Sequence, residues 1–173
     1  LISGVSANSG DICVTTEAFC SVASEMPLSA KSTAEYIREA VRVCNDEIWG
    51  TLNASIIIHP KSLKDPAVAE AFDEAIKTLR YGAVAVNHWP ALAYGMVTTT
   101  WGGYPGHALH DIQSGRDVVH NTYMFDRVEK TVVTGPFRVT PKPPWFVTNS
   151  NTAAIARRLF YFEANPSWLK VPG

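Results

Sequence analysis

Two amphipathic helical segments constrain the fold of this chain more than any other sequence feature. Residues 32–48 open with the capping-box pattern STAE, in which a serine and a glutamate satisfy the first free N–H groups of a helix. The apolar residues that follow recur on one helical face: Ile37, Ala40, Val41, Cys44 and Ile48. Residues 65–80 begin with Asp-Pro, a cap and a first-turn proline, and Gly82 supplies the stop. We therefore expect helices over both segments.

Short apolar runs separate and flank these two helices. Residues 19–26, 52–58 and 83–86 read as strands, which gives the order strand, helix, strand, helix, strand. Such an order is typical of a parallel sheet with right-handed crossovers. The middle run contains Ser-Ile-Ile-Ile without alternation, which predicts a strand buried on both faces. The predicted fold class is α/β, a three-layer αβα arrangement with a mostly parallel sheet, plus a C-terminal strand and tail.

The second half of the chain has a different character. Residues 81–110 contain no Asp, Glu, Lys or Arg, and their glycines and prolines favour a long irregular segment over a site or an interface. The run from Lys130 to Thr134 is strand-like. Residues 141–145 read PKPPW and are expected to be extended, and Asn151 is expected to cap a last helix. We divide the chain into residues 1–127 and a C-terminal part, 128–173.

Composition excludes several classes of protein. Only 18% of the 173 residues are charged and 46% are hydrophobic, which argues against intrinsic disorder. The formal net charge of −1 gives no reason to expect a nucleic-acid partner. No apolar run approaches the roughly 18 residues of a membrane span, and no signal peptide is visible. Three cysteines make an odd and sparse set, so we expect a reducing, cytoplasmic setting.

Two local patterns suggest chemistry but are weak on their own. Cys13 follows Asp11, and a neighbouring carboxylate raises a thiol pKa, so a nucleophilic role for Cys13 is not expected. His107, His110 and Asp111, with His120 further on, could in principle bind zinc. No recognised metal signature accompanies them, so we predict ordinary hydrogen-bonding histidines and no metal site.

Residues 17–22 carry the first specific resemblance. They read EAFCSV, which resembles the E-x-F-G-P-V segment of the aldehyde dehydrogenase superfamily. Four further segments are similar to that family in order: NDEIWGTLNAS at 45–55, LRYGAVAVN at 79–87, TWGGY at 100–104, and Tyr123 followed by EKTV at 129–132. The resemblance covers roughly residues 1–134. Cys20-Ser21 stands where the family has Gly-Pro, and residues 137–173 match no segment of the family.

The resemblance implies a function for several residues. It implies that Glu17 binds the ribose hydroxyls of NAD or NADP, and that Phe19 lies against the nicotinamide ring. Trp89, Trp101 and Tyr104 become candidates for the wall of a substrate tunnel. In the family, the nucleophilic cysteine lies some hundred residues before the E-x-F segment. Together with the absence of an initiator methionine, this leads us to expect that the nucleophile and the cofactor fold precede Leu1, and that this fragment alone is inactive.

Two hypotheses follow. The first is the C-terminal part of the catalytic domain of an aldehyde dehydrogenase-like oxidoreductase, acting on an aldehyde substrate through a cysteine thiohemiacetal. The alternative is a non-catalytic interaction or assembly module that keeps part of this fold. Under the first, we expect a homo-oligomer in which the strand from Lys130 to Thr134 joins a partner, with Trp145 and Phe146 near the interface. The competing interpretation folds that strand onto its own sheet.

Overall fold

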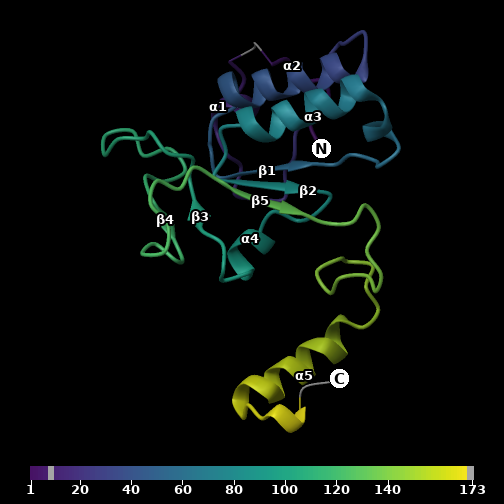
Figure 1. Cartoon of the computed structure of the whole chain (residues 1–173), viewed down its shortest axis with the longest axis vertical. Coiled ribbons are helices and arrows are strands. Elements are labelled where there is room, and N and C mark those ends of the chain that lie inside the picture. The colour runs from purple at the N-terminus through teal and green to yellow at the C-terminus, as the bar shows by residue number, and fades with distance from the viewer. Residues whose placement is uncertain (8–9, 171–173) are drawn as a thin grey trace. The chain divides into compact units, whose positions relative to one another are not determined.

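A three-stranded parallel sheet forms the centre of the computed structural model, which describes residues 1–7 and 10–170 (Figure 1). Its strands are β1 (Asn53–Ile56), β2 (Ala83–Val86) and β5 (Thr131–Thr134), in the order β1-β2-β5. In the register, Ala54 lies opposite Val84, and Val84 lies opposite Val132. The predicted mixed α/β class and parallel sheet are confirmed.

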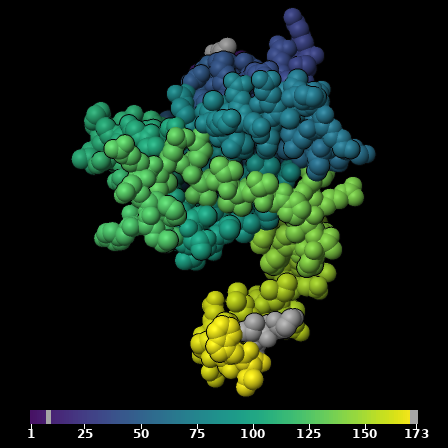
Figure 2. Space-filling model, viewed as in Figure 1, coloured from purple at the N-terminus to yellow at the C-terminus, as the bar shows by residue number. Residues whose placement is uncertain are grey.

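Helices α2 (Thr33–Asp46) and α3 (Pro66–Thr78) pack against each other on one face of the sheet (Figure 1). In the space-filling view, the blue atoms of this part of the chain form one continuous mass (Figure 2). Both begin where the sequence predicts. The Ser32 hydroxyl accepts a hydrogen bond from the amide of Glu35, and the Asp65 carboxylate accepts one from Ala67. Short helix α4 (Leu92–Gly95) lies on the opposite face of the sheet and contacts β5 (Figure 1).

The core lies between this helix pair and the sheet. Strand β2 is the central strand, and all four of its residues are buried. A central strand of a parallel sheet is covered on both faces, so its residues are apolar throughout. One cluster contains Ile58, Val68 and Val86, and a second contains Leu79, Tyr81 and Val84. The stripes predicted for α2 and α3 supply the partly buried residues that complete both clusters.

Two strand predictions are wrong. Residues 19–26 form no strand and share only a single bridge, from Ser24 to Ile2. The apolar side chains of this segment are not buried against the sheet: Phe19 is 91% exposed and Val22 is half exposed. The expectation that β1 is buried on both faces also fails, because β1 is an edge strand of the described sheet and Ile57, just after it, is 69% exposed.

Strand β5 pairs with β2 of its own sheet, as the competing interpretation of this run proposed. The edge of β5 away from β2 carries no strand among the described residues, so pairing with a partner chain stays a prediction. Lys130 precedes β5 and has a structural role: its ammonium group donates hydrogen bonds to the carbonyls of Ile76, Lys77 and Leu79 at 2.7–3.3 Å. These are the free carbonyls at the C-terminal end of α3.

Between β2 and β5 the chain is mostly irregular, as expected. It contains α4 and the two-residue strands β3 (Trp101–Gly102) and β4 (Val118–Val119), which pair antiparallel. Glycines let these segments approach the sheet: a Cβ on Gly82 would collide with the carbonyl oxygen of Gly102. A Cβ on Gly103 would also come too close to the backbone, 2.6 Å from the carbonyl oxygen of Gly115.

The chain divides into two compact units, Leu1–Phe137 and Arg138–Gly173, so β5 belongs to the first unit. In the second, residues 141–145 were expected to be extended, but a turn begins at residue 144 and a second turn follows at residues 147–148. Helix α5 (Thr152–Ala164) and a short 3₁₀ helix, η2 (Trp168–Lys170), follow. Asn151 occupies the N-cap position of α5, but its side chain makes no capping hydrogen bond. No helix of the described residues is both long and apolar enough to span a membrane.

Candidate functional site

Glu17 lies in the wall of a cavity of about 340 Å³ beside the amino end of the sheet. Short helix α1 (Ile12–Thr15), capped by Asp11, precedes it, and buried Val14 anchors that helix to the first unit. The carbonyl of Val14 accepts a hydrogen bond from the amide of Trp49 at 2.8 Å. This bond connects the Glu17 segment to the loop between α2 and β1.

The opposite wall of this cavity comes from residues 48–53 and from more distant parts of the chain. Gly50 has a φ of 103°, a conformation that favours glycine, and turns the chain toward β1. The amide of Thr51 donates to the Ser114 hydroxyl at 2.8 Å. Tyr81 also lines the cavity, and its hydroxyl donates to the Cys44 carbonyl at 2.9 Å. The wall opposite Glu17 is therefore held by hydrogen bonds across the unit.

Phe19 is not brought to the same cavity. Its side chain is 91% exposed and is not among the residues that line the space next to Glu17. Glu17 is exposed and borders a cavity, whereas Phe19 is exposed and borders none of the cavities described here. The structure therefore does not bring the two predicted cofactor residues together, and the cofactor role of each stays a prediction.

Cys13 lines the cavity too, but its environment disfavours the thiolate. The Asp11 carboxylate next to Cys13 raises the pKa of its thiol above the ordinary value, and burial adds to this increase. A raised pKa lowers the fraction of thiolate at neutral pH, and the thiolate is the nucleophilic form. That Cys13 is an ordinary cysteine stays a prediction.

A second cavity, of about 480 Å³, shares residues 48–50 with the first. Tyr104, His107, Arg80 and Gln113 line it. Burial, and then the neighbouring Glu129 carboxylate, raise the pKa of Tyr104. The Thr51 hydroxyl and the Nε2 atom of His107 lie 3.0 Å apart, so these two side chains share a hydrogen bond. Sequence reasoning missed this pair, because nothing in the local pattern indicates that His107 lies over the start of β1.

The three aromatic residues proposed for a tunnel lie in different surroundings. Trp101 on β3 makes an edge contact with Tyr94, with ring centroids 5.9 Å apart. Tyr104 lies beneath the Lys130 ammonium group, 5.4 Å from its ring centroid, and faces the second cavity. Trp89 follows β2 and is half exposed. Neither cavity described here is lined by Trp89 or Trp101.

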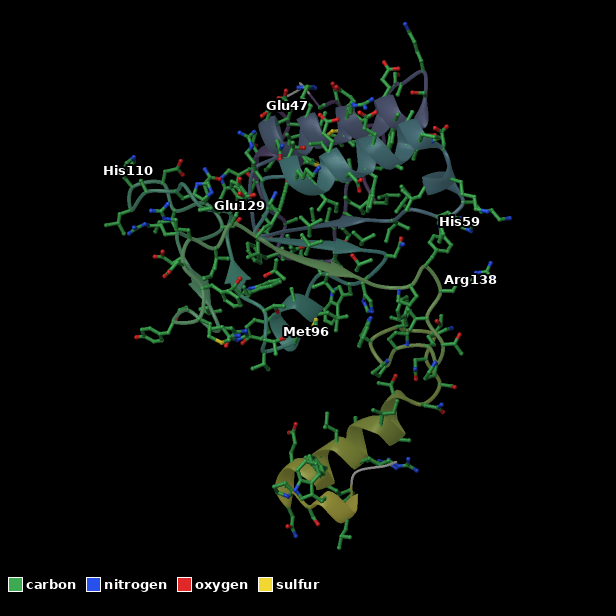
Figure 3. The ribbon with its side chains drawn as sticks, viewed as in Figure 1. Glu47, His59, Met96, His110, Glu129 and Arg138 are labelled. Atoms are coloured by element: carbon green, nitrogen blue, oxygen red, sulfur yellow. The ribbon has the colours of Figure 1, made fainter. Side chains whose placement is uncertain are left out.

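The histidines considered for zinc are also dispersed. His107 bonds Thr51, whereas His120 stacks on Tyr94 with ring centroids 4.9 Å apart. His110 lies at the tip of the loop between β3 and β4 and points away from the sheet (Figure 3). Among the residues that the structure describes, no group of three or more His, Cys, Asp or Glu side chains is arranged to hold a metal ion.

Comparison of the chain with family models, with curated proteins and with solved structures finds no match. The resemblance to aldehyde dehydrogenases therefore depends on the sequence segments quoted above and stays a prediction.

Proposed function

We propose that this chain is the C-terminal part of the catalytic domain of an NAD(P)-dependent aldehyde dehydrogenase-like oxidoreductase. The observation that carries the proposal is the position of Glu17 in the wall of a 340 Å³ cavity, opposite the loop that joins α2 to β1. Cavities that bind small molecules commonly measure about 300–1,000 Å³. The five similar segments, in the same order as in that family, support the same function.

The cavity fits one end of a nicotinamide cofactor better than the whole molecule. A carboxylate such as that of Glu17 accepts hydrogen bonds from two vicinal ribose hydroxyls. The exposed Phe19 ring does not complete a nicotinamide pocket, and no glycine-rich phosphate loop stands in this sequence. When bound, the cofactor would accept hydride from the substrate. The role proposed for this chain is to hold the ribose, and the nucleophilic thiolate would come from a segment outside this sequence.

The test is ribose-dependent binding by the chain. We expect nicotinamide mononucleotide and NAD⁺ to shift the amide NMR signals of Glu17, Trp49 and Gly50. Glu17→Gln should weaken this binding, because losing a charge-assisted hydrogen bond costs about 1.5–3 kcal/mol, which is roughly a 10- to 150-fold loss of affinity. The matched control is Glu25→Gln, since Glu25 is exposed and lies outside the cavity. Equal binding by Glu17→Gln and the unmodified chain would remove Glu17 from the site.

One observation favours the alternative, a non-catalytic interaction or assembly module. Helix α5 has no buried residue, and large apolar side chains of the second unit are exposed, Trp168 and Leu169 above 90%. Exposed apolar and aromatic surface of this kind is typical of protein interfaces. A chain that binds no nicotinamide compound but associates through α5 would fit this second function.

A further inference from the structure

Helix α5 lacks the packing that stabilises helices in water. None of its 13 residues is buried, and among the described side chains of residues 138–169 only Pro143 is buried. Isolated helices shorter than about 12–15 residues are marginal in water, because nucleation is unfavourable and most helical stability comes from tertiary packing. We infer that α5 needs a surface to cover it.

The residues of α5 indicate the kind of surface. Ile155, Leu159 and Phe162 lie at positions i, i+4 and i+7, which puts them on one side of the helix. Arg158 borders this stripe, three residues after Ile155 and four before Phe162, whereas Arg157 lies away from it. Ile155 and Leu159 are 42% and 54% exposed. Aromatic residues and arginine are enriched at protein–protein interfaces. An apolar stripe of this spacing is what a helix presents to a hydrophobic groove.

Charge separates the two units strongly. Leu1–Phe137 contains ten basic and fifteen acidic residues, a formal charge of −5. Arg138–Gly173 contains five basic residues and a single acidic one, Glu163, a formal charge of +4. Opposite net charges attract over distances set by the ionic strength and raise the rate of association. The second unit therefore complements the first unit electrostatically.

The first unit has an apolar groove beside strand β1. A cavity of about 380 Å³ lies between α2 and the edge strand β1, and Ala75 and Leu79 at the end of α3 also line it. Tyr36, Ile37, Ala40 and Val41 form one wall and Ile57 contributes to the other; no Asp, Glu, Lys or Arg lines the groove. Tyr36 is 47% exposed and Ile57 is 69% exposed. Covering a strand edge with a helix is one way in which proteins prevent uncontrolled strand pairing.

The segment before α5 folds on itself within the second unit. The Asn149 side-chain amide donates to the Lys142 carbonyl at 2.6 Å, and the Thr152 hydroxyl donates to the Pro144 carbonyl at 2.8 Å. These bonds hold the start of α5 to the turns that precede it, but they bury none of the residues of α5.

We propose that the chain forms a two-fold dimer in which α5 of each copy lies in the α2–β1 groove of the other copy. A two-fold axis lets one exchange cover both grooves and both helices. The apolar stripe of α5 supplies the buried contact, and the opposite charges of the two units guide the encounter.

The test uses the complete 173-residue chain and sedimentation equilibrium. We expect a dimer whose dissociation constant rises with salt. Arg157→Glu/Arg158→Glu in α5, and separately Tyr36→Glu/Ile57→Glu in the groove, should each weaken the dimer at least about 30-fold, as expected for interface hot spots. The control is Arg116→Glu/Arg127→Glu, which makes the same change of charge at exposed positions of the first unit.

Mixing the α5 variant with the groove variant distinguishes this dimer from dimers that use other surfaces. Each variant keeps one intact half of the contact, so a mixture should form a heterodimer with one helix in one groove, although each variant alone is monomeric. The same four substitutions on one chain should give only monomer. Circular dichroism checks that every variant is folded.

Three results would overturn the proposal. One is a monomer at all concentrations for the unmodified chain. Another is a dimer that is dissociated by Val132→Glu in β5 but not by the arginine variant of α5. The third is a monomer whose α5 arginines are needed to bind vesicles containing anionic lipids, which would identify a membrane surface as the cover.

Discussion

Helices α3 and α5 are both 13 residues long, yet only one of them contributes to a core. Helix α3 buries Val68, Ala71 and Ala75 against α2 and the sheet. Helix α5 buries nothing. The same contrast separates the two units: every buried large apolar side chain among the described residues lies in Leu1–Phe137. Local sequence signals can therefore specify a helix in two places and leave only one of them stabilised by its own chain.

The two units should differ most in the stability lost when a leucine is truncated to alanine, buried Leu79 in the first unit and exposed Leu159 in the second. Leu79 is 3% exposed and belongs to the core, so Leu79→Ala should lower the free energy of unfolding by about 2–5 kcal/mol. Leu159→Ala should change it by less than about 0.5 kcal/mol below the concentration at which the chain self-associates. Urea unfolding of both variants measures this. Similar losses would show that α5 is covered within one chain.

Lys130 tests whether one side chain stabilises the end of α3. Its side chain is 8% exposed and caps three carbonyls, so Lys130→Met should cost about 1.5–3 kcal/mol. Amide hydrogen exchange should accelerate most in the last turn of α3. Lys77→Met, at an exposed position of the same helix, is the control. If the two variants lose equal stability, the cap contributes nothing specific.

Alkaline pH should weaken the first unit. Burial raises the pKa of Tyr81 above its usual value of 10.0, so the folded chain keeps the phenol protonated where the unfolded chain loses the proton. This contribution is complete below about pH 10 and is lost as the pH rises through the folded pKa, at up to about 1.4 kcal/mol per pH unit. Tyr81→Phe should flatten the decline of stability above pH 10 in denaturant titrations. An unchanged slope would contradict the assignment to Tyr81.

The smallest expected effect is the change in stability when the N-cap residues of α2 and α5 are each replaced by alanine. The Ser32 hydroxyl caps α2, so Ser32→Ala should cost about 1 kcal/mol. Asn151 holds the same position on α5 without a capping hydrogen bond, and Asn151→Ala should have no measurable effect. Thermal unfolding in the monomeric range measures both. A loss at Asn151 equal to that at Ser32 would remove this difference between the units.

Elements with several agreeing local signals were predictable from the sequence. For α2 and α3, the cap residues and the apolar period indicate the same start and the same buried face, and both helices form as predicted. For residues 19–26 only a short mixed run suggested a strand, and the segment forms none. Within the predicted run 52–58, strand β1 forms at Asn53–Ile56. Its place at the sheet edge depends on which distant strand pairs with β2, which local sequence does not encode.

The candidate site was less predictable for the same reason. Glu17 was identified from a resemblance, and the structure gives it a cavity, but the opposite wall depends on Ser114 and Tyr81. Ser114 bonds Thr51 in the loop before β1, 63 residues away in sequence, and Tyr81 bonds the Cys44 carbonyl of α2, 37 residues away. Asn87 follows β2 with a φ of 56°, and its side-chain oxygen accepts a hydrogen bond from the amide of Ile58. The Val-Asn pair at the end of the apolar run is the sequence signal that could have indicated this residue.

The hydrogen bonds from Lys130 to the end of α3 have a consequence for the order of events during protein synthesis. Their partners lie 51 to 54 residues earlier in the chain. When α3 leaves the ribosome, neither its C-terminal cap nor strand β5, the last strand of the sheet, has yet been made. Contacts between residues so distant in sequence form late in folding. We expect the nascent chain to hold α2, α3, β1 and β2 as an incomplete unit until residue 134 emerges, with one side of β2 open to other nascent chains or to a chaperone.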